Sequence, residues 1–225
     1  MSPPIGSVGR SVRGRRLPDA IPDSGLLHRY DWSHDSTTTS TVPDLQGSED
    51  LTGSFTDLNG SINGIQAGTF DGTDDTLDVD FATTVTQPFE VFSVSDSSDD
   101  GTDQDVFDAF KSNVIARRRF DSDEYQFFAG TGVNGSIPTT TPEIHTGVYN
   151  GVDSLLRESG TEILSGDVGT NDLDGLTAGS RRADVGNGNW FNGTIGEILI
   201  YDPSESGYSR SDVETYLSDK WGIEI

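Results

Sequence analysis

Short apolar runs, each interrupted after a few residues by glycine, asparagine or aspartate, constrain the fold of this chain more than any other feature. From Leu26 onward most runs are too short for helices. Asn-Gly and Asp-Gly pairs separate them, and such pairs readily adopt the positive φ angles of tight turns. The pattern predicts an all-β chain. We place turns at Asn59–Gly60, Asn63–Gly64, Asp71–Gly72, Asn134–Gly135, Asn150–Gly151 and Asn192–Gly193.

The apolar runs define the expected strands. Each is rich in β-branched and aromatic residues and is bounded by turn residues. The predicted strands are Leu26–Trp32, Leu51–Thr56, Gly68–Phe70, Leu77–Phe81, Phe89–Ser95, Val106–Lys111, Asn113–Phe120, Tyr125–Ala129, His145–Asn150, Ser154–Glu158, Thr161–Leu164, Leu176–Arg181 and Trp190–Tyr201.

One segment near the C-terminus has helical periodicity. Residues 206–221 place Val213, Tyr216, Leu217 and Trp221 on one face. Ser211 and Glu214 can form a capping box, a start at Ser206 is the alternative, and Gly222 is a natural stop. This predicts one helix packed across the end of a β-sandwich.

The first 24 residues differ from the rest of the chain. They are rich in proline and glycine and contain Arg10, Arg13, Arg15 and Arg16. We therefore expect an extended basic arm (residues 1–24) followed by one β domain (residues 25–225). At 225 residues and without cysteine, that domain can bury a core without disulfides.

The formal net charge of −24 restricts the partners and the environment. Aspartate dominates the acids, and Lys111 and Lys220 are the only lysines. This balance is typical of proteins from very salty water, where salt screens repulsion between carboxylates; an ordinary acidic soluble protein is the alternative. The charge disfavours nucleic-acid binding by the globular part. We expect no membrane span, and no signal peptide because the N-terminus lacks an apolar central region.

Three segments carry a family resemblance. They are Leu26–Ser33; the FDG-containing stretch Ala67–Asp78; and Trp190–Asp202 (WFNGTIGEILIYD), followed by the helix ending KWGI at Ile223. Together they resemble concanavalin A-like (laminin G-like) lectin domains. Residues 96–185 match only in their general pattern of short apolar runs interrupted by turn residues. The resemblance implies a jelly-roll β-sandwich closed by one C-terminal helix and an inclination towards carbohydrate.

Enzymatic function is not expected from the residues. Glycosidases need two carboxylates about 5 to 10 Å apart, and related enzymes carry them at alternate strand positions. The nearest string, Asp121-Ser122-Asp123-Glu124, places its last two acids on opposite faces. Three histidines and no cysteine give little support for triads or zinc sites. We therefore predict a non-catalytic protein.

Calcium is the one metal that the sequence and the resemblance suggest. Many domains of the family bind it at a rim through aspartate, asparagine and backbone oxygens. The candidate ligands are Asp71, Asp74 and Asp75, with Asp99, Asp100 and Asp103 as a second cluster. Solvated acidic loops are the alternative in a chain with so many aspartates.

Glycan binding needs an exposed aromatic side chain with polar groups nearby. Trp190 with Asn187 and Asn189 is one candidate, and Tyr125 with Phe127 is another. Burial in the core or on the sheet is the competing interpretation of these aromatic residues.

The basic arm suggests how the protein is used. Arginine forms bidentate contacts with carboxylates, so the arm is expected to anchor the domain to other structural proteins of one assembly. We predict a homo-oligomeric virion component on the extracellular particle surface of a virus of a halophilic archaeon: a capsid decoration, turret or tail fibre with a lectin-like domain for a cell-surface glycan. The alternative is a free carbohydrate-binding or glycoside-hydrolase-related protein of a halophilic microbe.

Overall fold

The computed structural model describes residues 20–98, 101–115, 118–119, 124–136, 142–182 and 186–225. Most of the predicted arm, including all four of its arginines, lies outside these ranges. So do Asp99 and Asp100 of the second acidic cluster. None of the helices in the described ranges has the length and apolar character needed to cross a bilayer.

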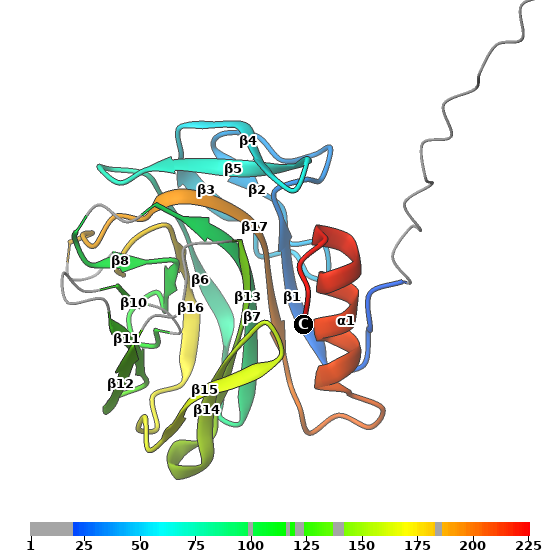
Figure 1. Cartoon of the computed structure of the whole chain (residues 1–225), viewed down its shortest axis with the longest axis vertical. Helices are drawn as coiled ribbons and strands as arrows, with labels where there is room; N and C mark the ends of the chain where they lie inside the picture. Colours follow the sequence, from blue (N-terminus) through cyan, green and yellow to red (C-terminus); the bar gives the residue numbers. More distant parts are fainter. Residues whose placement is uncertain (1–19, 99–100, 116–117, 120–123, 137–141, 183–185) are drawn as a thin grey trace, which may run out of the picture.

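The protein is an all-β sandwich with one C-terminal helix, as the sequence predicts (Figure 1). Its larger layer is a sheet with the order β15-β14-β13-β7-β17-β5-β4, in which β1 also pairs with β17. β17 can hold three neighbours because β5 pairs with its first half and β1 with its second half, opposite β7. The strands of this layer are β1 (Leu26–Asp31), β4 (Asp57–Ile62), β5 (Ile65–Asp71), β7 (Phe89–Ser97), β13 (Glu143–Tyr149), β14 (Ser154–Glu158), β15 (Thr161–Gly166) and β17 (Asn192–Tyr201).

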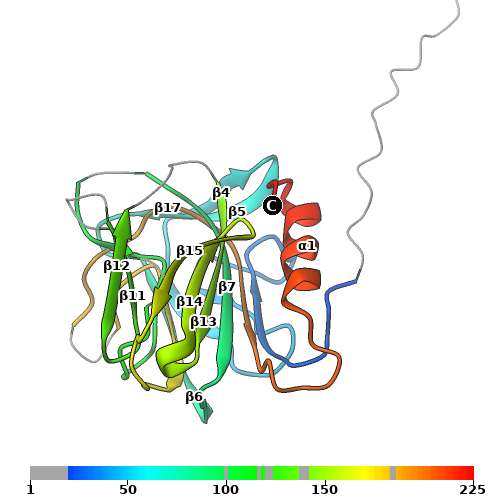
Figure 2. The ribbon, with the colours of Figure 1, turned by 60° about the horizontal axis from the view of Figure 1, so that its bottom comes forward.

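Two smaller sheets form the facing layer, with the orders β2-β3-β6-β16-β9 and β12-β11-β10-β8. β12 lies beside β15 of the larger sheet, so close that a Cβ on Gly135 would stand 2.2 Å from Leu164 Cδ2 (Figure 2). The strands are β2 (Thr41–Val42), β3 (Leu51–Ser54), β6 (Thr76–Val85), β8 (Gln104–Asp105), β9 (Phe107–Asp108), β10 (Arg118–Arg119), β11 (Glu124–Phe128), β12 (Gly132–Ser136) and β16 (Leu173–Ala178); a 3-10 turn, η1 (Gly151–Asp153), precedes β14.

Both faces of the larger sheet are covered, which explains the continuous apolar sequence of β17. Ile198 and Ile200 enter the core between the two layers. Leu199 and Tyr201 point the other way, into a second cluster under the helix. A strand buried on both faces is expected to lack the usual polar alternation.

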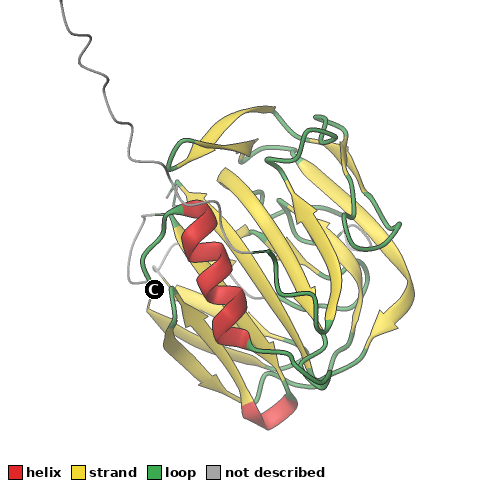
Figure 3. Cartoon of the chain, turned by 90° about the vertical axis from the view of Figure 1, so that its right-hand side faces the viewer, coloured by secondary structure: helices red, strands yellow, loops and turns green. Residues whose placement is uncertain are grey.

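The helix α1 (Arg210–Trp221) lies along the outer face of the larger sheet (Figure 3). The predicted buried face is confirmed, and Gly222 ends the helix at φ 66°. The predicted start is wrong, because Ser209, not Ser206 or Ser211, caps the helix by accepting from the backbone N–H of Asp212. The helix covers a sheet face and does not lie across the end of the sandwich.

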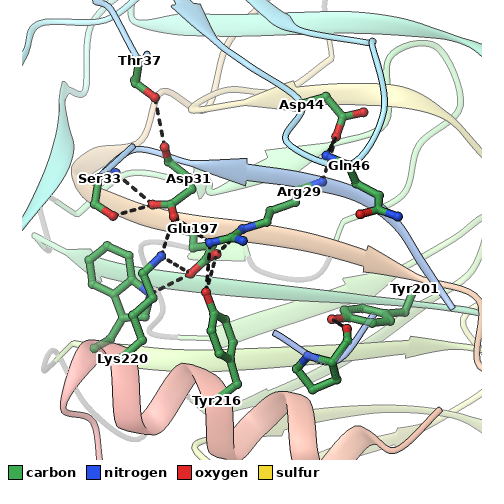
Figure 4. Close-up of polar contacts among 12 residues, drawn as sticks. Arg29, Asp31, Ser33, Thr37, Asp44, Gln46, Glu197, Tyr201, Tyr216 and Lys220 are labelled. Atoms are coloured by element: carbon green, nitrogen blue, oxygen red, sulfur yellow. Dashed lines mark hydrogen bonds and ion pairs between the residues drawn. The ribbon is translucent and has the colours of Figure 1, made fainter. Parts of the chain in front are cut away.

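A charged network fastens α1 to the sheet (Figure 4). Glu197 of β17 is fully buried and lies 2.7 Å from Lys220 Nζ and 3.0 Å from Arg29 Nε. Trp221 Nε1 and Tyr216 Oη donate to the same carboxylate at 3.0 and 3.2 Å. Lys220 also lies 2.6 Å from Asp31 of β1, so one lysine joins the helix to two strands.

Three predicted turns are wrong. Asn59–Gly60 and Asn134–Gly135 lie inside β4 and β12, and Asn192–Gly193 begins β17. These glycines allow close packing. A Cβ on Gly60 would lie 2.7 Å from Thr194 Cγ2, and one on Gly193 would lie 2.2 Å from the carbonyl oxygen of Asp96. The Asn63–Gly64 turn is confirmed, with both residues at positive φ.

The strand predicted at Val106–Lys111 is shorter in the structure, as β9. Of the strand predicted at Asn113–Phe120, Arg118 and Arg119 form β10, and residues 116, 117 and 120 lie outside the described residues. β9 ends at Asp108, whose Oδ1 accepts hydrogen bonds from the backbone N–H groups of Ala109 and Val114. A side chain that takes these donors competes with the strand ladder.

Candidate functional site

A cavity of about 350 Å³ opens at the edge of the larger sheet, where β1 faces the end of β6. Small-molecule sites usually begin at about this volume. The lining combines hydroxyl, carboxylate and imidazole groups with apolar side chains: Leu27, His28, Glu49, Thr83, Thr84, Val85, Thr86 and Asp202.

His28 is held rigidly at the wall of this cavity. Its ring stacks on Phe81, with centroids 4.1 Å apart and planes 7° from parallel. Nδ1 lies 2.8 Å from Asp44 Oδ2, and Nε2 lies 3.7 Å from Glu49 Oε2. Stacking and the Asp44 contact together fix the orientation of the imidazole.

Asp44 determines which ring nitrogen carries the proton. Burial raises the pKa of Asp44, but hydrogen bonds from His28 and from the backbone of Arg29 outweigh it, and the pKa falls below its ordinary value. An ionised carboxylate only accepts, so Nδ1 of His28 donates to it. In the neutral imidazole, Nε2 is then an acceptor, and it lies 3.7 Å from Glu49 Oε2.

The backbone around Asp44 explains how a loop forms this arrangement. Asp44 Oδ1 accepts from the backbone N–H groups of Arg29 and Gln46 at 3.0 and 3.1 Å. Gly47 follows at a position where a Cβ would lie 2.5 Å from Asp44 Oδ2. A glycine is therefore needed for the loop to close on this carboxylate.

Trp190, predicted as a glycan-stacking residue, is partly exposed in the segment between β16 and β17. Asn189 beside it has φ 47°, and its Nδ2 donates to Asp105 Oδ2 at 3.2 Å. Asn187 is also partly exposed in this segment. The three predicted residues therefore lie together on one rim segment, which we call the Trp190 rim.

Tyr125 and Phe127, the second predicted stacking pair, are fully buried on β11. Phe127 packs against Tyr149 at 4.7 Å between ring centroids, and Tyr125 packs edge-on against His145 at 5.2 Å. The alternating pattern was correct, but this face of β11 points into the sandwich. The pair therefore cannot form an exposed platform.

The structure brings together the carboxylates of Asp71, Asp74 and Asp75, with their oxygens within 4.8 Å of one another. Asp75 already has a structural role. Its Oδ2 accepts from the backbone and hydroxyl of Thr56 at 3.0 and 2.7 Å and from the backbone of Asp71 at 2.8 Å. These bonds stabilise the crossing from β5 to β6, and calcium at this place stays a prediction.

Sequence reasoning missed the cavity beside His28. Its groups come from β1, from the loop after β2, from the end of β6 and from Asp202 just after β17. Leu27 and Asp202 are 175 residues apart in the sequence. An alternating His28–Tyr30 face on the first strand was visible, but nothing in the sequence placed Asp44 or Glu49 opposite it.

Comparison with known proteins identifies the fold. No family model matches the sequence, and no curated protein matches it. The structure is similar to a Trypanosoma rangeli sialidase in complex with sialic acid, with a TM-score of 0.61 and 13% identity over 92% of this chain and 35% of the sialidase. The chain thus spans about a third of the length of that protein.

A second similar structure is domain 4 of AbnA, a GH43 extracellular arabinanase from Geobacillus stearothermophilus, in complex with arabinotriose. Here the TM-score is 0.57 and the identity 17%, over 86% of this chain and 98% of that domain. Both similarities place the chain in a sandwich fold found in carbohydrate-active proteins.

These neighbours overturn the prediction that the protein is not an enzyme. Solved structures that share its fold include a sialidase and a domain of an arabinanase, so a fold of this kind gives no ground for excluding glycoside chemistry. The sequence argument failed because it searched for paired acids on one strand only, whereas the folded chain assembles its polar groups from several elements.

Proposed function

We propose that this protein binds a neutral saccharide in the cavity beside His28, as a carbohydrate-binding domain of a glycan-processing system. The observation that carries the proposal is the lining of that cavity. Thr83, Thr84 and Thr86 supply hydroxyl groups, and Glu49 and Asp202 supply carboxylates that accept from sugar hydroxyls. Such mixed donors and acceptors beside apolar walls are typical of sugar sites.

The charge of the cavity favours a neutral sugar over an acidic one. The lining contains two carboxylates, Glu49 and Asp202, and the whole chain carries a net charge of −24. A carboxylated sugar such as sialic acid would be repelled on approach and inside the site. Arabinotriose, the ligand of the arabinanase domain, has no such charge.

The test is calorimetric titration of the full chain with arabinotriose and other neutral oligosaccharides, with sialyllactose as the acidic comparison. We expect binding of at least one neutral oligosaccharide and none of sialyllactose. Thr84→Val and Thr86→Val each remove one hydroxyl at nearly constant volume. Each is expected to weaken binding about two- to tenfold, the usual value of one hydrogen bond.

Thr161→Val, on the exposed start of β15, is the matched control and should bind like the wild type. Trp190→Ala distinguishes between the two candidate sugar sites, the cavity beside His28 and the Trp190 rim. If it abolishes binding while the threonine variants bind normally, the sugar lies on the Trp190 rim and the cavity assignment is wrong. Tight binding of sialyllactose would contradict the neutral-sugar proposal.

The salt-adapted surface, the anchoring arm and the position on a virus particle stay predictions from the sequence alone. They are compatible with sugar binding, since a domain that recognises surface glycans can belong to a particle or to a free protein. The fold similarities favour a free carbohydrate-related protein over a component of a virus particle.

A further inference from the structure

Three side chains of metal-ligand type converge inside the sandwich, on strands other than those that line the surface cavity. Glu143 and His145 alternate along β13, and Glu158 lies opposite His145 on the neighbouring strand β14. Glu143 and His145 are buried, and the Glu158 side chain is 12% exposed. Tyr125 reaches this group from β11 in the facing layer.

The spacing of these atoms fits a metal ion. His145 Nε2 lies 3.8 Å from Glu143 Oε2 and 3.9 Å from Glu158 Oε2, and all three atoms are within 4.8 Å of one another. The point equidistant from them is therefore roughly 2.2 to 2.5 Å from each, within a few tenths of an ångström of zinc–ligand distances.

Tyr125 adds a fourth oxygen or nitrogen atom to this group. Its Oη is 3.1 Å from His145 Nε2 and 3.2 Å from each of Glu143 Oε2 and Glu158 Oε2. An atom nearly equidistant from three others stands above their plane, here about 2 Å from the same central point. The four atoms thus lie at similar distances from one position, with Tyr125 Oη on one side of the plane of the other three.

We propose that Tyr125, Glu143, His145 and Glu158 bind one divalent metal ion of the zinc type. One imidazole nitrogen and three oxygens suit zinc, which prefers four ligands. Calcium needs six to eight oxygen ligands at longer distances and suits the group poorly. The ion would join β11 of the smaller layer to β13 and β14 of the larger one, as a structural link between the layers.

The experiment uses the full chain, stripped of metal with a chelator and kept in high salt, which screens weak binding of cations to the acidic surface. Zinc is titrated in by calorimetry, and thermal melts are recorded with and without it. We expect one zinc ion per chain and a higher melting temperature, because a ligand that binds only the folded state stabilises it. Calcium and magnesium should not reproduce this.

Tyr125→Phe and Glu158→Gln test the ligands with little risk to folding, since the first keeps the packed ring and the second changes a partly exposed side chain. Each should weaken zinc binding at least about tenfold. Losing a residue that only hydrogen-bonds to a metal ligand typically costs this much, so losing a ligand itself should cost no less. Glu162→Gln, four residues along on exposed β15, and Asp74→Asn, in the other acidic group, are the controls.

Cobalt(II) provides a readout that needs no variant. Four-coordinate cobalt absorbs visible light far more strongly than the six-coordinate aqueous ion, so the wild type should give an intense visible band that zinc abolishes. The proposal is overturned if cobalt keeps its weak aqueous spectrum, or if Glu158→Gln binds zinc like the wild type.

Discussion

Lys220 Nζ lies 2.7 Å from Glu197 Oε2, and this contact joins the C-terminal helix to a strand at the centre of the larger sheet. Burial raises the pKa of Glu197, and Asp31 adds to the rise, while Lys220 and Arg29 oppose it. For Asp31, burial also acts to raise the pKa, but Lys220 and Ser33 lower it below its ordinary value. The lysine therefore holds two buried carboxylates in place.

Replacing this lysine should destabilise the fold strongly. Lys220→Met keeps the side-chain volume but leaves Glu197 and Asp31 with Arg29 as their remaining cation within the network. Breaking a buried ion pair by removing one partner typically costs about 3 to 5 kcal/mol. The measurement is the free energy of unfolding from denaturant titration.

The chain's other lysine provides the control for this experiment. Lys111 pairs with Asp80 at the surface, where its side chain is 53% exposed. Lys111→Met should change the free energy of unfolding by less than about 1 kcal/mol. Equal effects of the two lysine variants would show that the network under α1 adds nothing beyond a surface pair.

Asp108 should make stability depend on pH in an identifiable window. Burial raises its pKa to about 6, against the ordinary 3.8. The folded state then holds the proton more strongly, so the stability from this group is present below about pH 4 and is lost as the pH rises through 6. The difference amounts to roughly 3 kcal/mol.

Asp108→Asn removes the ionisable group at this position. The pH dependence that Asp108 contributes should therefore disappear, even if the variant is less stable than the wild type at every pH. Unfolding free energies measured between pH 4 and 7 should fall less steeply in the variant than in the wild type. Asp35→Asn, at an exposed position, should retain the wild-type slope. Parallel slopes for wild type and Asp108→Asn would contradict a raised pKa at Asp108.

The salt-adapted surface predicts that the protein loses stability when salt is removed. With a net charge of −24, repulsion between carboxylates acts over about 10 Å at 0.1 M salt but only about 3 Å at 1 M. The melting temperature followed by circular dichroism should rise steeply with sodium chloride. A melt that is the same at tens of millimolar and at molar salt would refute the prediction.

The structure refines where the basic arm can be cut. Ile21 packs against the outer core cluster, and Tyr201 Oη donates to the carbonyl oxygen of Pro22 at 2.7 Å. Deleting residues 1–19 should leave the unfolding free energy unchanged. Deleting residues 1–22 should cost about 2 kcal/mol, from one hydrogen bond and one partly buried aliphatic side chain.

The shorter truncation also tests the anchoring role of Arg10, Arg13, Arg15 and Arg16, because it keeps Ile21 and Pro22, which contact the domain. If the arm binds a partner, the chain lacking residues 1–19 should fold but fail to enter its native assembly. Normal incorporation of that chain would assign the docking to the sandwich itself.

Local sequence patterns determined most of the secondary structure. The apolar spacing of Val213, Tyr216, Leu217 and Trp221 predicted the buried helix face, and Gly222 its end, because both depend on neighbours within one turn. The continuous apolar sequence of β17 is likewise typical of a strand covered on both faces, as the structure shows it to be. Such features depend on residues close together in the chain.

The tertiary structure alone decided which elements meet. Alternation on β11 showed that Tyr125 and Phe127 share a face, but only packing decided that this face points inward. His28 meets Asp44 across a loop, and Tyr125 meets Glu143 and Glu158 from the opposite layer. A strand's period of two fixes the relative sides of its residues, whereas the choice of core side depends on burial summed over the whole chain.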